Sequence, residues 1–454
     1  MFSGREAAVV GIGVSNLSLI NYLLGQGARV FAMDRKTREE LGETAAMLEA
    51  KGVTLRLGPG YLDELHRYEL VFLTPGMKKD IPEVERARAS GARIESEMGL
   101  FLSLCRGRTV AVTGSAGKTT TTTLTGEMLK ASGRNVFVGG NIGTPLIERL
   151  DDIGEEDLVV LELSSFQLEL TKVSPQVAGI TNIGVDHLDV HGSAEAYRNA
   201  KMNIFRFQRP EDVTALNADD EITRALAPEC PGRVLYFSRQ SRPDQGAFLK
   251  DDRLHVHLDG RDHVLCKASE VGIPGPHNLE NALLASLLSI SAGADPDAVS
   301  SVLVSFKGIE HRLETVCECN GVRYVNDSIA TSPVRAIAAL RTVPAPILLI
   351  AGGYDKGLPY REYARAMRGK VRILFTLGKT AEKIERAVRE ELGDDAMPIQ
   401  RVESLEQAVM RSHEEARPGD TVLLSPASAS YDMFRNFEER GRRFKQLVRE
   451  MVGR

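Results

Sequence analysis

The sequence predicts an α/β protein of three domains, and three features of the chain support this prediction. Short apolar strands alternate with glycine-rich turns and amphipathic helices over most of the 454 residues, a pattern typical of parallel sheets covered by helices. The length suits two to four domains of roughly 100–200 residues each. A new strand followed by a new glycine-rich loop begins at Arg108, which indicates that a second domain starts there.

The first domain, residues 1–96, is expected to be Rossmann-like. Strand-like runs occur at 7–11, Arg29–Asp34 and Glu69–Gly76. The loop 11–16 follows the first run and resembles a dinucleotide-binding fingerprint, with the acidic Asp34 ending the next strand. Asn16 replaces the third glycine of that fingerprint. The loop therefore fits a nucleotide-bearing ligand, with NAD as the first guess for the motif alone, or it is simply a tight turn.

The second domain, residues 97–308, is expected to be a parallel sheet of the P-loop ATPase type with a small antiparallel addition. Further strand-like runs occur at Leu158–Ser164, Val177–Gly184 and Val213–Asp220. The segment Ala247–Lys267 then alternates apolar and polar residues, with Asp259-Gly260 at a tight turn. Such alternation around a two-residue turn predicts antiparallel hairpins.

A phosphate-binding loop is predicted where this second domain begins. The loop consists of Gly114, Ser115, Ala116, Gly117, Lys118, Thr119 and Thr120. Glycines let backbone N–H groups approach phosphate, the start of a helix favours anions, and a lysine places its charge on the β- and γ-phosphates. Thr119 can offer a hydroxyl to Mg²⁺. The spacing differs from a standard Walker loop, since Val112 stands where that motif has its first glycine.

The third domain, residues 309–454, is expected to be Rossmann-like as well. Its strand-like runs lie at Gly321–Ser328, Pro346–Gly353, Val371–Gly378 and Thr421–Ser428, with charged helices between them. Functional sites of such sheets lie at the carboxyl ends of the strands. The polar motifs that follow these runs are therefore candidates for binding.

Composition excludes several classes of protein. The 57 Lys and Arg residues against 62 Asp and Glu give a net charge of −5, which supplies no general attraction for nucleic acid or an anionic membrane. No apolar run approaches the ~18 residues that span a bilayer, and the first residues lack the apolar core of a signal peptide. The five scattered cysteines predict neither a disulfide framework nor a zinc site. A cytoplasmic protein is expected.

Taken together, the motifs resemble those of the Mur ligase family along nearly the whole chain. The residues that support this resemblance are Gly114–Thr120, Gly139–Gly143, Glu162–Leu168, Asp186–Asp189, Lys201, His277–Asn281, His311-Arg312, Asn326–Ser328, Gly352–Lys356 and Ser425–Phe434. The stretches around Ser165–Gln167 and Ser425–Phe437 point to the member of the family that adds D-glutamate.

The resemblance implies an ATP-dependent amide ligase of peptidoglycan precursor synthesis. Such an enzyme phosphorylates the carboxylate of UDP-MurNAc-L-Ala, and the amine of D-glutamate then attacks the acyl phosphate. A carboxylate is a poor electrophile because oxide leaves badly, and phosphorylation removes that obstacle. The protein has to neutralise phosphate charge and hold the amine in line.

The resemblance also assigns residues to ATP and to Mg²⁺. Lys118 holds the β- and γ-phosphates, and two Mg²⁺ sites take their ligands from Thr119, Glu162, His187 and Lys201. Lys201 is carbamylated in this interpretation, because a carbamate attracts Mg²⁺ where an ammonium repels it; without the resemblance it is a solvated helix lysine. The rest of the nucleotide contacts Asn278, Asn281, Arg312 and Asp327.

The two other substrates receive their own residues from the resemblance. Those assigned to the UDP substrate are Ser15, Asp34, Arg35, Gly76, Asn141 and His187. Those assigned to D-glutamate are Thr331, Lys356, Ser430, Tyr431 and Phe437, with Lys356 paired to a carboxylate. The chain departs from the family at Asn16, where glycine is usual, and at Ile329, where a lysine commonly follows Asn326–Ser328.

Several alternatives stay open at this point. Another amino-acid-adding ligase of the same family or a folylpolyglutamate synthase would use the same phosphate loop. A non-catalytic UDP-sugar sensor would not need Lys118, Glu162, His187 and Lys201 together. An NAD-dependent dehydrogenase would leave the second phosphate loop unexplained. A monomer is expected.

Overall fold

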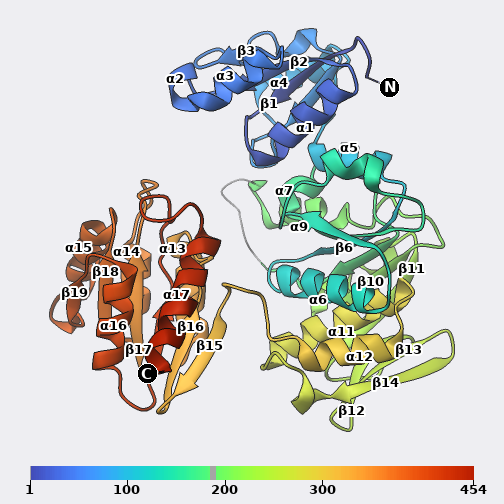
Figure 1. Cartoon of the computed structure of the whole chain (residues 1–454). Coiled ribbons are helices and arrows are strands. Elements are labelled where there is room, and N and C mark those ends of the chain that lie inside the picture. Colours follow the sequence, from blue (N-terminus) through green and yellow to red (C-terminus); the bar gives the residue numbers. More distant parts are fainter. Residues whose placement is uncertain (1, 185–190, 454) are drawn as a thin grey trace. The chain divides into compact units, whose positions relative to one another are not determined.

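The computed structural model describes residues 2–184 and 191–453. These residues form two compact units, Met1–Phe306 and Lys307–Arg454 (Figure 1). The first unit contains two sheets and the second unit contains one, so the expectation of a three-domain α/β protein is confirmed. In the described part of the chain, no helix is long and apolar enough to cross a bilayer.

The first sheet is parallel throughout, with the strand order β3-β2-β1-β4-β5. Its central strand β1 is buried along nearly its whole length, as expected for a strand covered by helices on both faces. The strands are β1 (Glu6–Val10), β2 (Arg29–Asp34), β3 (Thr54–Leu57), β4 (Leu70–Leu73) and β5 (Arg93–Glu95). The helices are α1 (Val14–Gly25), α2 (Arg38–Leu41), α3 (Glu43–Ala50) and α4 (Pro82–Ala89).

The second sheet has nine strands in the order β14-β13-β12-β11-β10-β9-β6-β8-β7. The strands β6 to β12 run parallel and the last two pairs are antiparallel. Their bounds are β6 (Arg108–Thr113), β7 (Val136–Gly140), β8 (Leu158–Glu162), β9 (Val177–Ile180), β10 (Val213–Asn217), β11 (Arg233–Ser238), β12 (Gly246–Lys250), β13 (Arg253–Leu258) and β14 (Arg261–Lys267). Asp259 and Gly260 both have positive φ, 52° and 74°, as a two-residue hairpin turn requires. The predicted antiparallel addition is therefore confirmed.

Two helices that cover this sheet position the phosphate loop. Helices α6 (Lys118–Ala131) and α11 (Pro276–Ser291) pack against each other, and Leu124, Leu284 and Leu288 join the strand residues in one buried core. This packing fixes the first turns of both helices beside the carboxyl ends of β6 and β9. The other helices are α5 (Glu97–Leu104), α7 (Ser165–Leu168), α9 (Ala194–Met202), α10 (Glu221–Arg224) and α12 (Pro296–Ser305).

The second unit is one sheet with the strand order β15-β16-β20-β17-β18-β19 and only β15 antiparallel to its neighbour. The strands are β15 (Glu314–Cys319), β16 (Val322–Asn326), β17 (Ile347–Gly352), β18 (Val371–Leu377), β19 (Ile399–Arg401) and β20 (Thr421–Leu424). The helices are α13 (Pro333–Thr342), α14 (Arg361–Met367), α15 (Ala381–Leu392), α16 (Leu405–Glu415) and α17 (Phe437–Val452). Because β20 lies between β16 and β17, the loops after these three strands meet at one edge.

Candidate active site

The loop between β6 and α6 has the backbone of a phosphate-binding loop. Gly114 and Gly117 have φ of +149° and +86°, and a Cβ at either position would overlap the Thr181 hydroxyl or the Asn281 carboxamide. Only glycine fits both the backbone angle and the space. The predicted loop thus forms a tight turn that opens directly into the first turn of a helix, where anions are favoured.

Lys118 lies on this loop. Its Nζ donates to the carbonyl oxygens of Gly114 (2.8 Å) and Ser115 (3.0 Å). An ammonium held by two carbonyls can exchange these contacts for phosphate oxygens, which carry a full negative charge.

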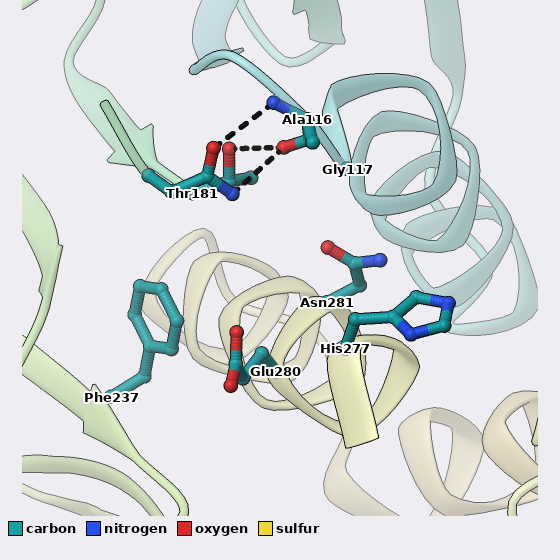
Figure 2. Close-up of a pocket in the computed structure, with 8 residues that line it drawn as sticks. Ala116, Gly117, Thr181, Phe237, His277, Glu280 and Asn281 are labelled. Carbon is teal, nitrogen blue, oxygen red and sulfur yellow. Dashed lines mark hydrogen bonds between the residues drawn. The ribbon is translucent and has the colours of Figure 1, made fainter. Parts of the chain in front are cut away.

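Two residues after β9, which no sequence motif indicated, brace the loop. The Asn182 Oδ1 accepts from the Ala116 amide at 3.0 Å, while the Thr181 hydroxyl and the Asn182 Nδ2 donate to the Ala116 carbonyl at 2.6 and 3.2 Å (Figure 2). Both follow a strand next to β6, so their place at a carboxyl edge was the signal that could have identified them.

A cavity of about 140 Å³ opens between the phosphate loop and the start of α11 (Figure 2). Phe237 offers an apolar ring, whereas His277, Glu280 and Asn281 offer polar groups. The Asn281 Oδ1 accepts from Thr121 Oγ1 at 3.3 Å. A planar apolar surface beside a few polar groups suits a heteroaromatic base.

Of the two predicted adenine contacts, Asn281 lines this cavity and Asn278 does not. The Asn278 Nδ2 donates to the Pro274 carbonyl at 2.7 Å, and its Oδ1 accepts from Asn281 Nδ2 at 3.3 Å. Asn278 therefore orients Asn281 in the structure. The N-cap residue of α11 is Gly275 rather than Asn278.

Glu162 ends β8 with its side chain almost completely buried. Its Oε1 accepts from Asn141 Nδ2 at 2.7 Å, while its Oε2 is buried and has no hydrogen-bond partner among the described residues. A buried carboxylate oxygen without a partner is expensive unless a cation or donor occupies its open side. Oxygen is also the donor that Mg²⁺ prefers, so Glu162 fits a metal ligand.

Lys201 is buried, with 1% of its surface exposed. Its Nζ donates to the Gly114 carbonyl at 2.8 Å and lies 4.6 Å from the centre of the Tyr197 ring. The alternative of a solvated helix lysine is therefore wrong. Lys118 and Lys201 donate to the same carbonyl oxygen, which places both amines at the phosphate loop.

His187 lies outside the described residues, as does the rest of the segment 185–190. The neighbouring His191 stacks on Phe166 with ring centres 4.9 Å apart, and its Nε2 lies 3.0 Å from Ser165 Oγ. Within 2–184 and 191–453, no three His, Cys, Asp or Glu side chains gather as a metal site. Of the four predicted metal ligands, Glu162 is the one whose side chain is a carboxylate.

A second cavity, of about 290 Å³, is lined by both domains of the first unit. It brings together two residues assigned to the UDP substrate, Ser15 and Asn141. The other lining residues are Val14, Pro75, Gly140, Gly143, Pro145, Ser164, Phe166 and Gln167. The predicted Arg35 and Gly76 are exposed and do not line it.

The glycine loop of the first domain is held by two buried polar side chains. Asp34 accepts from the amides of Ile12 (2.7 Å) and Lys36 (2.9 Å) through its two carboxylate oxygens. The Asn16 Nδ2 donates to the carbonyls of Val10 (2.9 Å) and Gly11 (2.8 Å). Asn16, the departure from the family pattern, therefore ties the loop to the strand that precedes it.

In the second unit, Asp327 follows β16 with its carboxylate buried. Its Oδ2 accepts from Ser425 Oγ at 2.8 Å and its Oδ1 from the Leu313 amide at 3.2 Å. Burial raises the pKa of Asp327 to about 7, against the lowering effect of the Ser425 hydrogen bond. Arg312 is exposed and lies close enough to lower that pKa slightly.

Of the residues assigned to D-glutamate, four lie in the segments that follow β16, β17 and β20, and Phe437 is the first residue of α17. They differ in exposure: Lys356 and Tyr431 are exposed, Thr331 and Phe437 are half-buried, and Ser430 is buried. Tyr431 packs edge-on against Tyr354 with ring centres 5.9 Å apart. The exposed ammonium of Lys356 can pair with a carboxylate of a ligand.

Comparison with known proteins agrees with this architecture. Family models match the Mur ligase MurD-like N-terminal domain over residues 5–96, the Mur ligase middle domain over 112–289, and the Mur ligase glutamate ligase domain over 311–428. The chain belongs to the Mur ligase family.

Two relatives indicate where in the family it lies. The UDP-N-acetylmuramoylalanine--D-glutamate ligase of Symbiobacterium thermophilum is 53% identical over 98% of both chains. The enzyme of the same name from Acetivibrio thermocellus is 48% identical over 98% of this chain and 96% of its own. Among solved structures, UDP-N-acetylmuramate-alanine ligase from Thermotoga maritima shares the fold, with a TM-score of 0.55, 22% identity, and coverage of 98% of this chain and 99% of its own.

Proposed function

We propose that this chain is an ATP-dependent ligase that joins D-glutamate to UDP-N-acetylmuramoyl-L-alanine in peptidoglycan precursor synthesis. The relatives at 53% and 48% identity over nearly the full length support the choice of amino acid and UDP substrate. The observation that carries the chemistry is the cluster of Lys118, Lys201 and the unpartnered Glu162 carboxylate oxygen around one phosphate loop.

The reaction has two steps. The carboxylate of UDP-N-acetylmuramoyl-L-alanine attacks the γ-phosphorus of ATP, which forms an acyl phosphate and releases ADP. The amine of D-glutamate then attacks the acyl carbon, the C–O bond to phosphate breaks, and the amine loses a proton as the amide forms. The protein contributes mainly position and charge, as expected for phosphoryl transfer.

Lys118 and the loop amides would hold the β- and γ-phosphates, with Gly114–Thr120 around them. The proposed ligand set for two Mg²⁺ ions consists of Thr119, Glu162, His187 and Lys201. When bound, the two ions would neutralise phosphate charge. The buried Glu162 Oε2, which has no hydrogen-bond partner among the described residues, supports this set. A carbamate on Lys201 would replace one of two adjacent positive charges with a negative one, which favours divalent cations nearby.

The cavity at the start of α11 is the proposed adenine site, with Asn281 at its wall and Asn278 hydrogen-bonded to Asn281. Arg312 and Asp327 are the proposed contacts to the nucleotide from the third domain. The cavity that contains Ser15 and Asn141 is the proposed site of the UDP substrate, with Asp34, Arg35 and Gly76 around it. D-glutamate would contact Thr331, Lys356, Ser430, Tyr431 and Phe437.

We also propose domain limits of 1–96, 97–308 and 309–454, a monomer, and a cytoplasmic location. Limited proteolysis tests the limits, and light scattering of the purified protein tests the monomer.

The decisive experiment measures ADP release with each UDP-muramoyl substrate against a panel of amino acids. Turnover should require UDP-N-acetylmuramoyl-L-alanine and D-glutamate together, with L-glutamate poor. Equal turnover with L-alanine or diaminopimelate would reassign the chain within the family, and release with folate substrates would indicate a folylpolyglutamate synthase. Binding without any ADP release would indicate a non-catalytic sensor.

A further inference from the structure

A buried arginine lies outside every residue set described so far. Arg440 is in the first turns of α17, and only 2% of its surface is exposed. Arginine is rarely buried unless its donors are satisfied. Its sequence context, Glu438-Glu439-Arg440, is that of an ordinary charged helix, so the burial requires an explanation.

The guanidinium group joins two loops that are about a hundred residues apart in the chain. Toward the loop after β16, Nε donates to Ser328 Oγ at 3.0 Å and Nη2 to the Ser328 carbonyl at 2.9 Å. Toward the loop after β20, Nη2 donates to the Ser428 carbonyl at 3.1 Å and Nη1 to the Ala429 carbonyl at 3.2 Å. The planar fork of arginine suits this double contact, which a lysine cannot reproduce.

The group keeps its charge in this position. Burial lowers the pKa of Arg440 to about 10, and the nearby Asp432 carboxylate opposes that shift. A pKa near this value leaves the guanidinium protonated at neutral pH, so its hydrogen bonds to the carbonyls are charge-assisted.

These contacts determine which way the backbone of the second loop faces. The Ala429 carbonyl also accepts from the Tyr354 amide at 2.9 Å. The carbonyls of Ser428 and Ala429 are thus turned toward the protein. Among the described residues, no acceptor contacts the amides of Ser430 and Tyr431. Consecutive N–H groups without acceptors form a ready site for a carboxylate.

The surroundings leave this arrangement little freedom. Gly353 has φ of +145°, and a Cβ there would overlap the Ala429 carbonyl and approach Arg440 Nη1. On the other side, Ser328 Oγ donates to the Phe437 carbonyl at 2.8 Å, which fixes the start of α17. Losing the guanidinium would therefore free the second loop first, since Ser328 keeps its bond to Phe437.

We infer that Arg440 is a positioning residue for the incoming amino acid: it anchors the carbonyls of Ser428 and Ala429 so that the amides of Ser430 and Tyr431 receive a carboxylate of D-glutamate. This inference rests on the proposed D-glutamate site. It assigns to Arg440 no contact with substrate.

The test compares four full-length variants with the wild type in ADP-release kinetics. Arg440→Met removes the fork, and Arg440→Lys keeps a charge without it. Arg443→Met is the matched control, because Arg443 lies one turn further on α17 in a partly exposed ion pair with Glu406. Lys356→Ala tests the D-glutamate site itself. Apparent KM values are measured for all three substrates, and thermal unfolding is recorded for each variant.

Arg440→Met should raise the KM for D-glutamate by about tenfold or more, with the KM values for ATP and the UDP substrate within about threefold of wild type. Arg440→Lys should raise the KM for D-glutamate by a smaller factor and leave the other two KM values nearly unchanged. If Arg440→Met does not fold, the result for Arg440→Lys decides the test. Arg443→Met should behave as wild type.

A further readout separates positioning from general damage. Exchange of ¹⁸O within ATP during acyl-phosphate formation needs no D-glutamate, so it should persist in both Arg440 variants. Equal loss of exchange and ligation, or a lowered unfolding temperature with unchanged KM values, would overturn the inference. If Lys356→Ala raises the KM for D-glutamate while the Arg440 variants do not, the site stands and the inference fails. If none of the three raises it, the proposed site itself fails.

Discussion

Glu162 offers the sharpest test of the proposed chemistry, because the same substitution should affect activity and stability in opposite directions. In Glu162→Gln the carboxamide oxygen can still accept from Asn141 Nδ2, the 2.7 Å bond that Oε1 makes now. What changes is Oε2, the buried atom without a partner. The substitution therefore removes a charge and leaves the one hydrogen bond of the side chain in place.

The expected magnitudes follow from these contacts. Loss of one preorganised electrostatic contact typically lowers kcat by about 10²–10³. A buried polar atom left without a partner costs about 1–3 kcal/mol. The carboxamide nitrogen that replaces Oε2 is also a polar atom without a partner, but it carries no charge, and burying a neutral group costs less than burying a charged one. The free energy of unfolding of the metal-free protein should therefore rise by about 1 kcal/mol.

The assay is thermal unfolding with and without Mg²⁺ and ADP, beside ADP-release kinetics. Without Mg²⁺, Glu162→Gln should unfold at a temperature equal to or above that of the wild type, and Mg²⁺ with ADP should stabilise it less. The control is Glu127→Gln, since Glu127 is an exposed α6 residue in an ion pair with Lys130. A variant that unfolds earlier without metal but keeps its kcat would refute the reasoning.

Three further outcomes can be checked. Gly117→Ala should raise the KM for ATP more than the KM for D-glutamate, because a Cβ would overlap Asn281 and the backbone angle favours glycine; an unchanged KM for ATP would remove the loop from the nucleotide site. Lys201→Ala should be nearly inactive and partly rescued by short carboxylates that supply the lost anion; full activity without rescue would contradict the carbamate. Asp327→Asn should gain stability relative to the wild type as the pH rises from about 4 to 8. The pKa of Asp327 is raised to about 7 in the folded protein, so the unfolded chain releases its proton first and the wild type loses stability with rising pH. Urea unfolding of both proteins at pH 5 and pH 8 measures their free energies of unfolding. A stability gain of Asp327→Asn over the wild type that is larger at pH 5 than at pH 8 would refute the prediction.

The sequence was enough to predict the three sheets and the phosphate loop, because both depend on local patterns. Apolar runs, turn residues and glycines at fixed spacing report on the nearest ten residues of backbone. The type of fold, the antiparallel hairpin at Asp259 and the loop 114–120 are all of this kind.

The sequence could not show which polar side chains are buried. Lys201 and Arg440 each lie in a helix with other charged residues, yet both are enclosed and bonded to backbone carbonyls of distant loops. Such partners are set by the folded sheet rather than by neighbours in the chain. The same holds for Asn182, whose side-chain carboxamide accepts from the Ala116 amide, 66 residues away in the chain.

The hydrogen bonds made by Asn16 and Asp34 affect the order in which ligands can bind to the protein. Both side chains hold the first glycine loop through its own backbone, so the loop has its shape before any substrate arrives. A loop that is already formed does not lose conformational entropy when a ligand binds to it. With the proposed UDP site at this loop, we expect UDP to bind with nearly the same affinity whether or not ATP is present.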